Sequence, residues 1–209
     1  MFFIEHISNK IGSGISSNLN LDKDTEEIIT YGAFAVLQTL WSFICIIILG
    51  IIFNVLIESI IISLSIAVFR KYSGGIHANS PNKCAIFGAF ICLGFSLLIK
   101  NINIDFNLAF ISIFILGFFY SYYTVYKFVP VDTKNKPIEN KEEKLRLKKY
   151  SFIVISGLFF IEVIFILIYL KYKYTGLIYY GSCVIIGVIW QSFTLTPVAK
   201  KIFYRFTMK

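Results

Sequence analysis

A polar stretch over residues 70–84 contains two side chains that could perform acyl transfer together, the thiol of Cys84 and the imidazole of His77. Ser80 is a good N-cap residue and Pro81 suits the first position of a helix, so the sequence predicts a helix that begins here. Cys84 then lies in the first turn, where unpaired N–H groups and the positive end of the helix dipole favour a thiolate over a thiol. The pattern therefore predicts a nucleophile at this point of the chain.

The base that would activate this nucleophile is His77, seven residues before Cys84. A proline lies between the two residues, so they do not share a helix. Gly74 and Gly75 allow a sharp turn just before the histidine, and this turn would return the imidazole toward the helix start. A single histidine in a loop is more often a surface or packing residue, and that interpretation stays open. The other cysteines lie inside apolar segments and are predicted to be packing residues: Cys45, Cys92 and Cys183.

The elements that position these residues follow from an apolar composition. Hydrophobic residues make up 57% of the 209-residue chain, charged residues 15%, and the mean hydropathy is +0.74, values outside the usual range of soluble domains. A helix needs about 20 apolar residues to cross the hydrocarbon. The run from Ile28 to Phe69 is about twice that length, and we divide it near Gly50 into two spans. Further spans are predicted over residues 84–99, 106–126, 151–170 and 176–196.

The sequence thus predicts an all-α, polytopic integral membrane protein with six transmembrane helices in one membrane domain, residues 1–209. The basic residues indicate its orientation. Two Lys or Arg residues precede the first span, three lie in residues 70–83, eight in residues 127–149 and four after Pro197. These segments share one side of a six-span arrangement and hold 17 of the 20 basic residues. The positive-inside rule then predicts that both termini and residues 70–84 face the cytoplasm.

Two segments outside the spans have patterns of their own. Within residues 1–20, isoleucines and a phenylalanine recur at helical spacing, which predicts an amphipathic interfacial helix in the inner leaflet; a frayed terminus is the alternative. Residues 127–149 form a basic connection with a predicted extended start and a predicted helix from Glu139 to Lys149. Its charge would set topology and attract anionic lipid. The sequence contains neither a Gly-rich phosphate loop nor a zinc-type His/Cys spacing, so no metal and no cofactor is expected.

The polar stretch carries a family resemblance. Its pattern, placed between the second and third spans, closely resembles that of the accessory gene regulator B (AgrB) family of bacterial quorum-sensing peptidases. The Pro- and Lys-rich segment VPVDTKNKPI also resembles the central connection of that family. The resemblance covers essentially the whole chain. The motif positions are Arg70, Gly74, Gly75, His77 and Cys84, and the resemblance implies that the last two are the catalytic pair.

This resemblance implies a cysteine endopeptidase in the bacterial cytoplasmic membrane, with its active site at the cytoplasmic face, that acts on an AgrD-type propeptide. Cys84 would attack a bond in the C-terminal part of the propeptide and His77 would transfer the proton. The resulting thioester would pass to the propeptide's own cysteine and close a thiolactone ring. The expected partners are this propeptide and the lipid bilayer, with a homodimer as a further hypothesis and no nucleic acid.

The roles of the other polar residues are hypotheses. Arg70 is a candidate for binding a substrate carboxylate and, equally, for a snorkelling anchor at the end of the second span. An acidic propeptide tail would be attracted by basic residues of the long connection, namely Lys144, Arg146 and Lys148. The group that orients His77 is left open among Asn79, Asn82 and Asp132.

The main alternative function is a small peptide exporter without protease chemistry. Its path would be marked by two intramembrane carboxyls, Glu58 and Glu162, because ionisable groups in lipid often have a function. Both are predicted about 10 to 12 Å below the outer surface of the membrane, on the side opposite to Cys84. They are expected to be hydrogen-bonded within the bundle, for example near Asn54 or Gln38.

Overall fold

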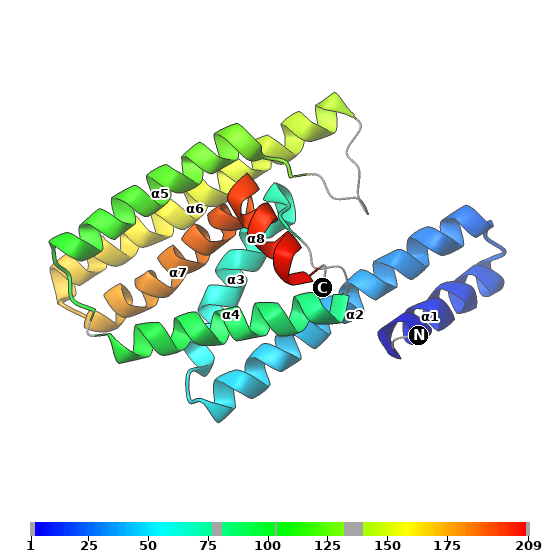
Figure 1. The fold of residues 1–209 in the computed structure, drawn as a ribbon, viewed down its shortest axis with the longest axis horizontal. Coiled ribbons are helices and arrows are strands. Elements are labelled where there is room, and N and C mark those ends of the chain that lie inside the picture. The colour runs from blue at the N-terminus through cyan, green and yellow to red at the C-terminus, as the bar shows by residue number, and fades with distance from the viewer. Residues whose placement is uncertain (1–2, 77–80, 103, 132–139, 208–209) are drawn as a thin grey trace.

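The computed structural model describes residues 3–76, 81–102, 104–131 and 140–207, and every regular element in this part of the chain is a helix (Figure 1). The all-α class is therefore confirmed. In chain order the helices are α1 (Phe3–Leu19), α2 (Lys23–Ile52), α3 (Leu56–Ser73), α4 (Pro81–Asn101), α5 (Leu108–Phe128), α6 (Lys141–Tyr172), α7 (Thr175–Thr194) and α8 (Pro197–Thr207).

Five helices of the described chain are long and apolar enough to cross a membrane: α2, α4, α5, α6 and α7. Each corresponds to a span predicted from the sequence, and together they support a multi-pass membrane protein. The remaining predicted span is α3, a helix of 18 residues, which extends about 27 Å. It carries Glu58 in its first turn and Arg70 and Lys71 in its last. The six-span count therefore stays a prediction at α3.

The outward faces of the long helices are apolar. Along α2, for example, Ile28 is 71% exposed and Ile51 is 62% exposed, and α6 similarly exposes Phe160 and Leu167. An apolar surface of this extent is unusual around a protein in water but normal where lipid surrounds the helices. These faces support a position within the bilayer.

Helix α7 occupies the centre of the bundle and packs against α3, α4, α5 and α6 (Figure 1). Small residues permit this close packing. A Cβ atom at Gly187 of α7 would lie 3.0 Å from the carbonyl oxygen of Ile62 on α3, and one at Gly117 of α5 would lie 2.7 Å from a methyl carbon of Ile189 on α7. Phenyl rings fill the space between α5 and α6, where Phe114, Phe118 and Phe159 stack or meet edge to face.

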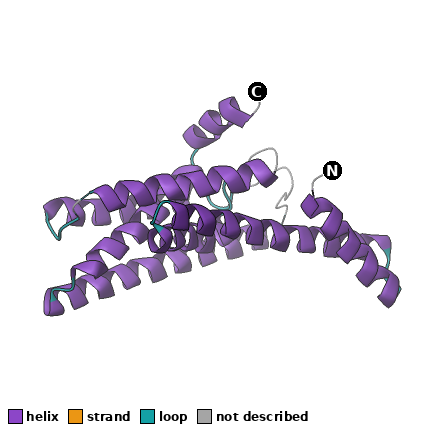
Figure 2. Cartoon of the chain, turned by 90° about the horizontal axis from the view of Figure 1, so that it is seen from below, coloured by secondary structure: helices purple, strands orange, loops and turns teal. Residues whose placement is uncertain are grey.

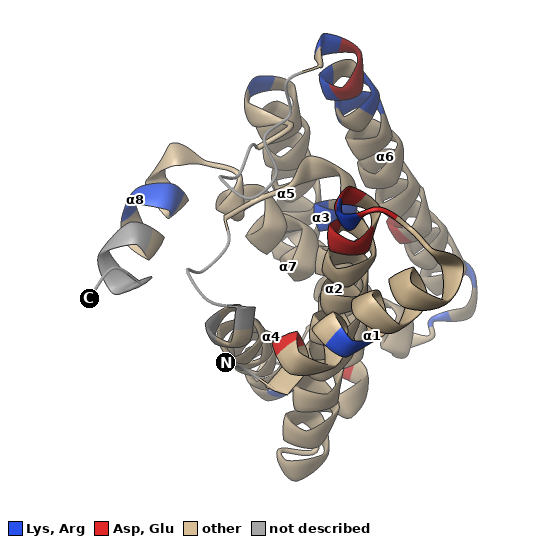
Figure 3. Ribbon diagram, turned by 90° about the vertical axis from the view of Figure 1, so that its right-hand side faces the viewer, with Lys and Arg blue, Asp and Glu red and all other residues tan. Residues whose placement is uncertain are grey.

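The two ends of the bundle differ in charge. We call one end the Cys84 end, because α3, α5 and α7 finish there and α4 and α6 begin there; the other is the Tyr179 end. Figure 3 views the molecule from the side of the Cys84 end, with Lys and Arg along the start of α6 and on α8. Three basic residues lie at or near the Tyr179 end: Lys100, Lys171 and Lys173. This separation matches the predicted charge asymmetry, while the N-in/C-in orientation itself stays a prediction.

The predicted N-terminal helix is present as α1, but its main contact was not foreseen. It runs beside the N-terminal half of α2, where α2 projects past the other helices (Figures 1 and 2). The face toward α2 is formed by buried small residues, Ser8, Gly12 and Ser16. A Cβ atom at Gly12 would lie 1.8 Å from Oγ1 of Thr30, so only glycine permits this approach. The location of α1 in the membrane surface stays a prediction.

The end of the chain contains a helix that the sequence analysis did not predict. The hydroxyl of Thr196 accepts a hydrogen bond from the backbone N–H of Ala199 at 3.3 Å, and Pro197 is the first residue of α8. This pair repeats the cap-and-proline signal that was recognised before Cys84. The predicted third span is also longer than residues 84–99, because α4 continues to Asn101.

Candidate active site at the Cys84 end

The predicted nucleophile lies where the sequence indicated. Helix α4 begins at Pro81, and Cys84 is half-buried in its first turn. Its predicted partner His77 lies outside the described residues, as do Ser80, Asn79 and Asp132. The pairing of the imidazole with the thiol therefore stays a prediction. The described chain does show what holds the backbone on the N-terminal side of the histidine.

That backbone makes the predicted glycine turn. Gly74 has φ 72° and Gly75 has φ 144°, both in the region that side chains with a Cβ rarely adopt. The N–H of Gly74 donates to the carbonyl of Arg70 at 3.0 Å and ends α3. The chain then leaves the helix axis before Ile76. This observation confirms the turn that was predicted between α3 and the histidine.

The turn is tied to the connection that follows α5. The N–H of Val131 donates to the carbonyl of Ser73 at 3.0 Å, and Gly74 and Val131 form an isolated parallel bridge. A Cβ atom at Gly74 would lie 2.6 Å from the carbonyl oxygen of Val131, which explains the need for glycine at this position. The first residues of the basic connection are thus part of the site's framework.

A third contact with the turn comes from α7, and the sequence analysis missed it. Gln191 is fully buried, and its Nε2 donates to the carbonyl of Gly74 at 2.8 Å and to Oγ of Ser73 at 3.1 Å. A Cβ atom at Gly75 would lie 3.3 Å from this Nε2. The sequence did contain a signal for this contact, because Gln191 is an amide side chain inside an otherwise apolar span, where a polar group needs a hydrogen-bond partner.

Arg70 points into the site. Its guanidinium donates to the carbonyl of Ile76, the residue that precedes the histidine, and its charge interacts with the thiol of Cys84. This geometry differs from a snorkelling anchor, whose charged group would reach away from the protein toward the lipid headgroups.

The three basic residues predicted to bind substrate do not share one face of α6. Lys144 and Arg146 are exposed, and two residues along a helix correspond to a rotation of about 200°, so they point to different sides. Lys148 is half-buried; its Nζ donates to the carbonyl of Tyr126 and lies 4.9 Å from the centroid of that ring. Lys148 therefore also fastens the start of α6 to the end of α5.

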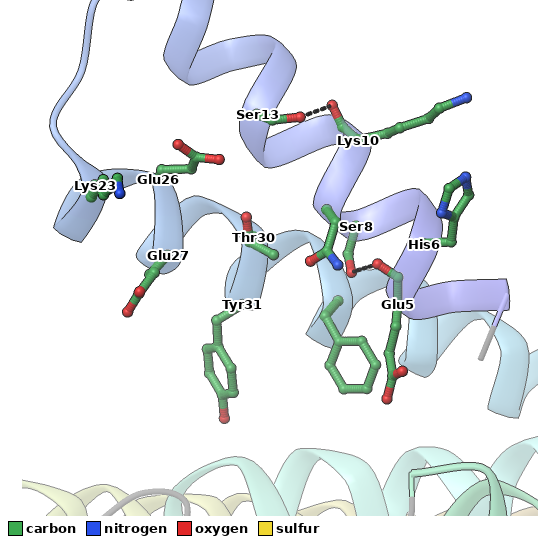
Figure 4. Close-up of a pocket in the computed structure, with 12 residues that line it drawn as sticks. Glu5, His6, Ser8, Lys10, Ser13, Lys23, Glu26, Glu27, Thr30 and Tyr31 are labelled. Atoms are coloured by element: carbon green, nitrogen blue, oxygen red, sulfur yellow. Dashed lines mark hydrogen bonds between the residues drawn. The ribbon is translucent and has the colours of Figure 1, made fainter. Parts of the chain in front are cut away.

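A polar cavity of about 760 Å³ lies between α1 and the start of α2 (Figure 4). Glu5, His6 and Lys10 line it from α1, and Glu26 and Tyr31 line it from α2. No cysteine is among the lining residues, so this cavity does not contain the nucleophile. The predicted nucleophile, Cys84, instead lies at the Cys84 end of the bundle, at the start of α4.

Comparison with known proteins shows the family of the chain. The family described as Accessory gene regulator B matches residues 8–195. The chain belongs to the AgrB family. It is 42% identical over 196 residues to an AgrB-like protein 2 of Clostridium perfringens, which covers 92% of this chain and 91% of that protein. It is 30% identical over 151 residues to the accessory gene regulator protein B of Staphylococcus aureus, over 72% and 71% of the two chains. No solved structure matches the chain.

Membership of the AgrB family implies a part in processing the peptide of an accessory gene regulator, or quorum-sensing, system. The resemblance inferred from the sequence motif is therefore confirmed at the level of the family. The motif residues Arg70, Gly74 and Gly75 are in contact in the fold, and Cys84 interacts with the first of them.

Proposed function

We propose that this protein is a membrane cysteine endopeptidase that cleaves an AgrD-type propeptide through a thioester on Cys84 and promotes closure of a thiolactone. One observation carries the proposal. The guanidinium of Arg70 donates to the carbonyl of Ile76 and is close enough to Cys84 for an electrostatic interaction, so one side chain relates the predicted nucleophile to the backbone that precedes His77 in the sequence.

In the first step, His77 takes the proton of Cys84 and the thiolate attacks the scissile carbonyl of the propeptide. The tetrahedral oxyanion would be stabilised by backbone N–H groups at the start of α4, which have no partner within their own helix. When the intermediate collapses, the C–N bond breaks and His77 returns the proton to the leaving amine. The propeptide's N-terminal fragment stays attached to Cys84 as a thioester.

In the second step, the thiol of the propeptide's internal cysteine attacks this thioester. His77 takes the proton of that thiol, one thioester bond breaks while another forms, and Cys84 leaves as a thiolate beside the protonated His77. The exchange is close to balanced in free energy, whereas attack by water is irreversible. The enzyme must therefore hold the internal cysteine close to Cys84 and limit the access of water, for which the edge of a membrane is a suitable place.

Docking of an acidic propeptide tail would use the exposed basic residues at the start of α6. Lys144 and Arg146 are the better candidates, because both are exposed, whereas Lys148 is half-buried. Lys144→Glu combined with Arg146→Glu should raise KM for the propeptide, and wild-type affinity should fall as salt rises. Binding that does not depend on salt would mean that these charges serve only topology and lipid contact.

The test is cleavage of a synthetic propeptide by purified protein in liposomes. Cys84→Ala should abolish cleavage, while Cys92→Ala, a buried cysteine two turns along the same helix, should keep most of it. A propeptide whose internal cysteine is replaced by alanine should form a hydroxylamine-sensitive adduct on Cys84. The intact propeptide should yield a cyclic product lighter by one water than the linear fragment.

Two results would contradict the proposal in different ways. Transport of an uncut peptide into the liposomes, with cleavage absent, would favour the alternative function as a peptide exporter. Linear product alone, under conditions in which a synthetic thiolactone survives, would leave a membrane cysteine peptidase and exclude the cyclising role.

A further inference from the structure

The two intramembrane carboxyls have very different surroundings in the Tyr179-end half of the bundle. Glu58 of α3 accepts a hydrogen bond from the hydroxyl of Tyr179 on α7 at 2.7 Å, so its partner is neither Asn54 nor Gln38 as the sequence analysis suggested. Glu162 of α6 is fully buried, and neither of its oxygens has a hydrogen-bond partner within the described chain. An unpaired carboxyl at such a position needs a physical explanation.

The fold provides a fitted space for the Glu162 carboxyl. It lies against Gly181 of α7, where a Cβ atom would come within 2.6 Å of Oε2. Any other residue at position 181 would displace the carboxyl. Two residues before Gly181 on α7 is Tyr179, the hydrogen-bond partner of Glu58. The two carboxyls therefore flank one segment of α7.

Glu58 is also close to solvent through its partner. Tyr179 lines a cavity of about 440 Å³ at this end of the bundle, together with Ile104, Asp105, Thr175 and Gly176. The same tyrosine hydroxyl that donates to Glu58 thus belongs to a residue in contact with the cavity. Glu58 is therefore linked to the cavity through Tyr179.

The titratable groups around Glu162 can be named for each helix that packs on α6. Helix α3 contributes Glu58, and α7 contributes Cys183 and, beyond it, Tyr179. From α5, the neighbour at the preceding turn of α6 is a phenyl ring, Phe114, stacked on Phe159. Among the described residues these helices place no Lys or Arg against Glu162. An ionised carboxylate there would be a buried charge without a counterion, so the protonated form of the carboxyl is strongly preferred over the ionised form.

We propose that Glu162 is a proton-binding site, coupled to Glu58 and through Tyr179 to the cavity at the Tyr179 end. A proton passes from water in the cavity to the Tyr179–Glu58 pair and then to a Glu162 oxygen, and it leaves by the same groups in reverse. No other reactant takes part. The bound proton lets α6 and α7 pack together at Gly181. Its loss places an unpaired charge between these two helices and weakens their contact.

The test compares wild-type protein with Glu162→Gln in detergent, with thermal unfolding measured from pH 5 to pH 9 at fixed NaCl. Because the folded state binds the proton more tightly than the unfolded state, this stabilisation is present at low pH and is lost as pH rises. The wild-type midpoint should therefore fall by at least about 3 °C relative to Glu162→Gln across the range. Glu142→Gln, at an exposed position of the same helix, is the matched control and should run parallel to wild type.

The coupling to Glu58 has its own measurement. A negative charge on Glu58 opposes ionisation of Glu162, so in a Glu58→Gln background the difference between Glu162 and Gln at position 162 should be smaller and should level off at a lower pH. Parallel curves for wild type and Glu162→Gln at all pH values would overturn the proton site. A difference that added Na⁺ removes at fixed pH would overturn it in favour of a metal cation. An unchanged difference in the Glu58→Gln background would overturn the connection to the cavity. These readouts measure stability, so they do not depend on the proposed peptidase chemistry.

Discussion

The clearest test of the site's framework is to remove Gln191, which holds the glycine turn without belonging to the proposed catalytic pair. Gln191→Ala deletes two hydrogen bonds from Nε2, to the Gly74 carbonyl and to the Ser73 hydroxyl. That hydroxyl also donates to the Gly74 carbonyl at 3.2 Å, so the carbonyl keeps one donor. At about 0.5–1.5 kcal/mol for each bond, the loss is about 1–3 kcal/mol.

If the turn must be held for catalysis, the same free energy should appear in the reaction rate. A loss of about 1–3 kcal/mol corresponds to roughly 5- to 150-fold in kcat, with a smaller change in KM for the propeptide. Cleavage in liposomes measures both constants. Gln191→Met keeps the length of the side chain without its donors and should behave like Gln191→Ala, which separates the hydrogen bonds from the effect of a cavity.

Ser192 provides the matched control. It is the next residue of α7, is fully buried, and donates from its hydroxyl to the Ser121 hydroxyl on α5 at 2.7 Å, away from the turn. Ser192→Ala should cost a similar amount of unfolding free energy and leave kcat nearly unchanged. The reasoning is refuted if the Gln191 variants keep wild-type kcat, or if Ser192→Ala lowers kcat as much as they do.

Three further predictions concern the same end of the molecule. Gly75→Ala should lower both the unfolding midpoint and the rate of cleavage, because φ at Gly75 is 144° and a side chain in this conformation costs roughly 1–3 kcal/mol. Gly88→Ala is the control and should be neutral or slightly stabilising, because a Cβ atom there meets open space. Equal effects of the two substitutions would contradict this prediction. The cysteine introduced by Lys144→Cys should react with an impermeant thiol reagent only after cells are opened. Labelling in intact cells would contradict the prediction that this end of the bundle faces the cytoplasm. Iodoacetamide should alkylate Cys84 in the folded protein well before the buried Cys92, as followed by mass spectrometry.

Local signals predicted the local parts of the site. The proline that begins α4 and the paired glycines that end α3 act through their own backbone preferences, so their positions could be inferred from neighbours in sequence. Gln191 lies 117 residues from Gly74, and Tyr179 lies 121 residues from Glu58. Hydrogen bonds between such distant residues depend on how the helices pack, and the sequence around each residue contains no trace of its partner.

The same distinction holds for the helices. The helical spacing of apolar residues predicted α1. The contact of α1 with α2, however, is made by small residues, Ser8, Gly12 and Ser16. An amphipathic pattern points to the apolar face of a helix and not to such a face. For α3, the length of the helix favours a transmembrane span, whereas the charged residues Glu58 and Arg70 argue against one. The helix nevertheless packs against the central helix α7. Their interactions with Tyr179 and with Ile76 satisfy these groups inside the fold, which a hydropathy average does not represent.

The hydrogen bond from Val131 to Ser73 also means that the two flanks of the long connection are held independently of each other. Val131 is fixed by its hydrogen bond to Ser73, and Asn140 starts α6 independently by accepting a hydrogen bond from the N–H of Glu142 at 2.9 Å. Each flank thus has its own anchor. A gene divided between these two points would encode an N-terminal piece carrying the nucleophile and a C-terminal piece carrying Gln191, and catalytic activity would then report the reassembly of the two pieces in one membrane.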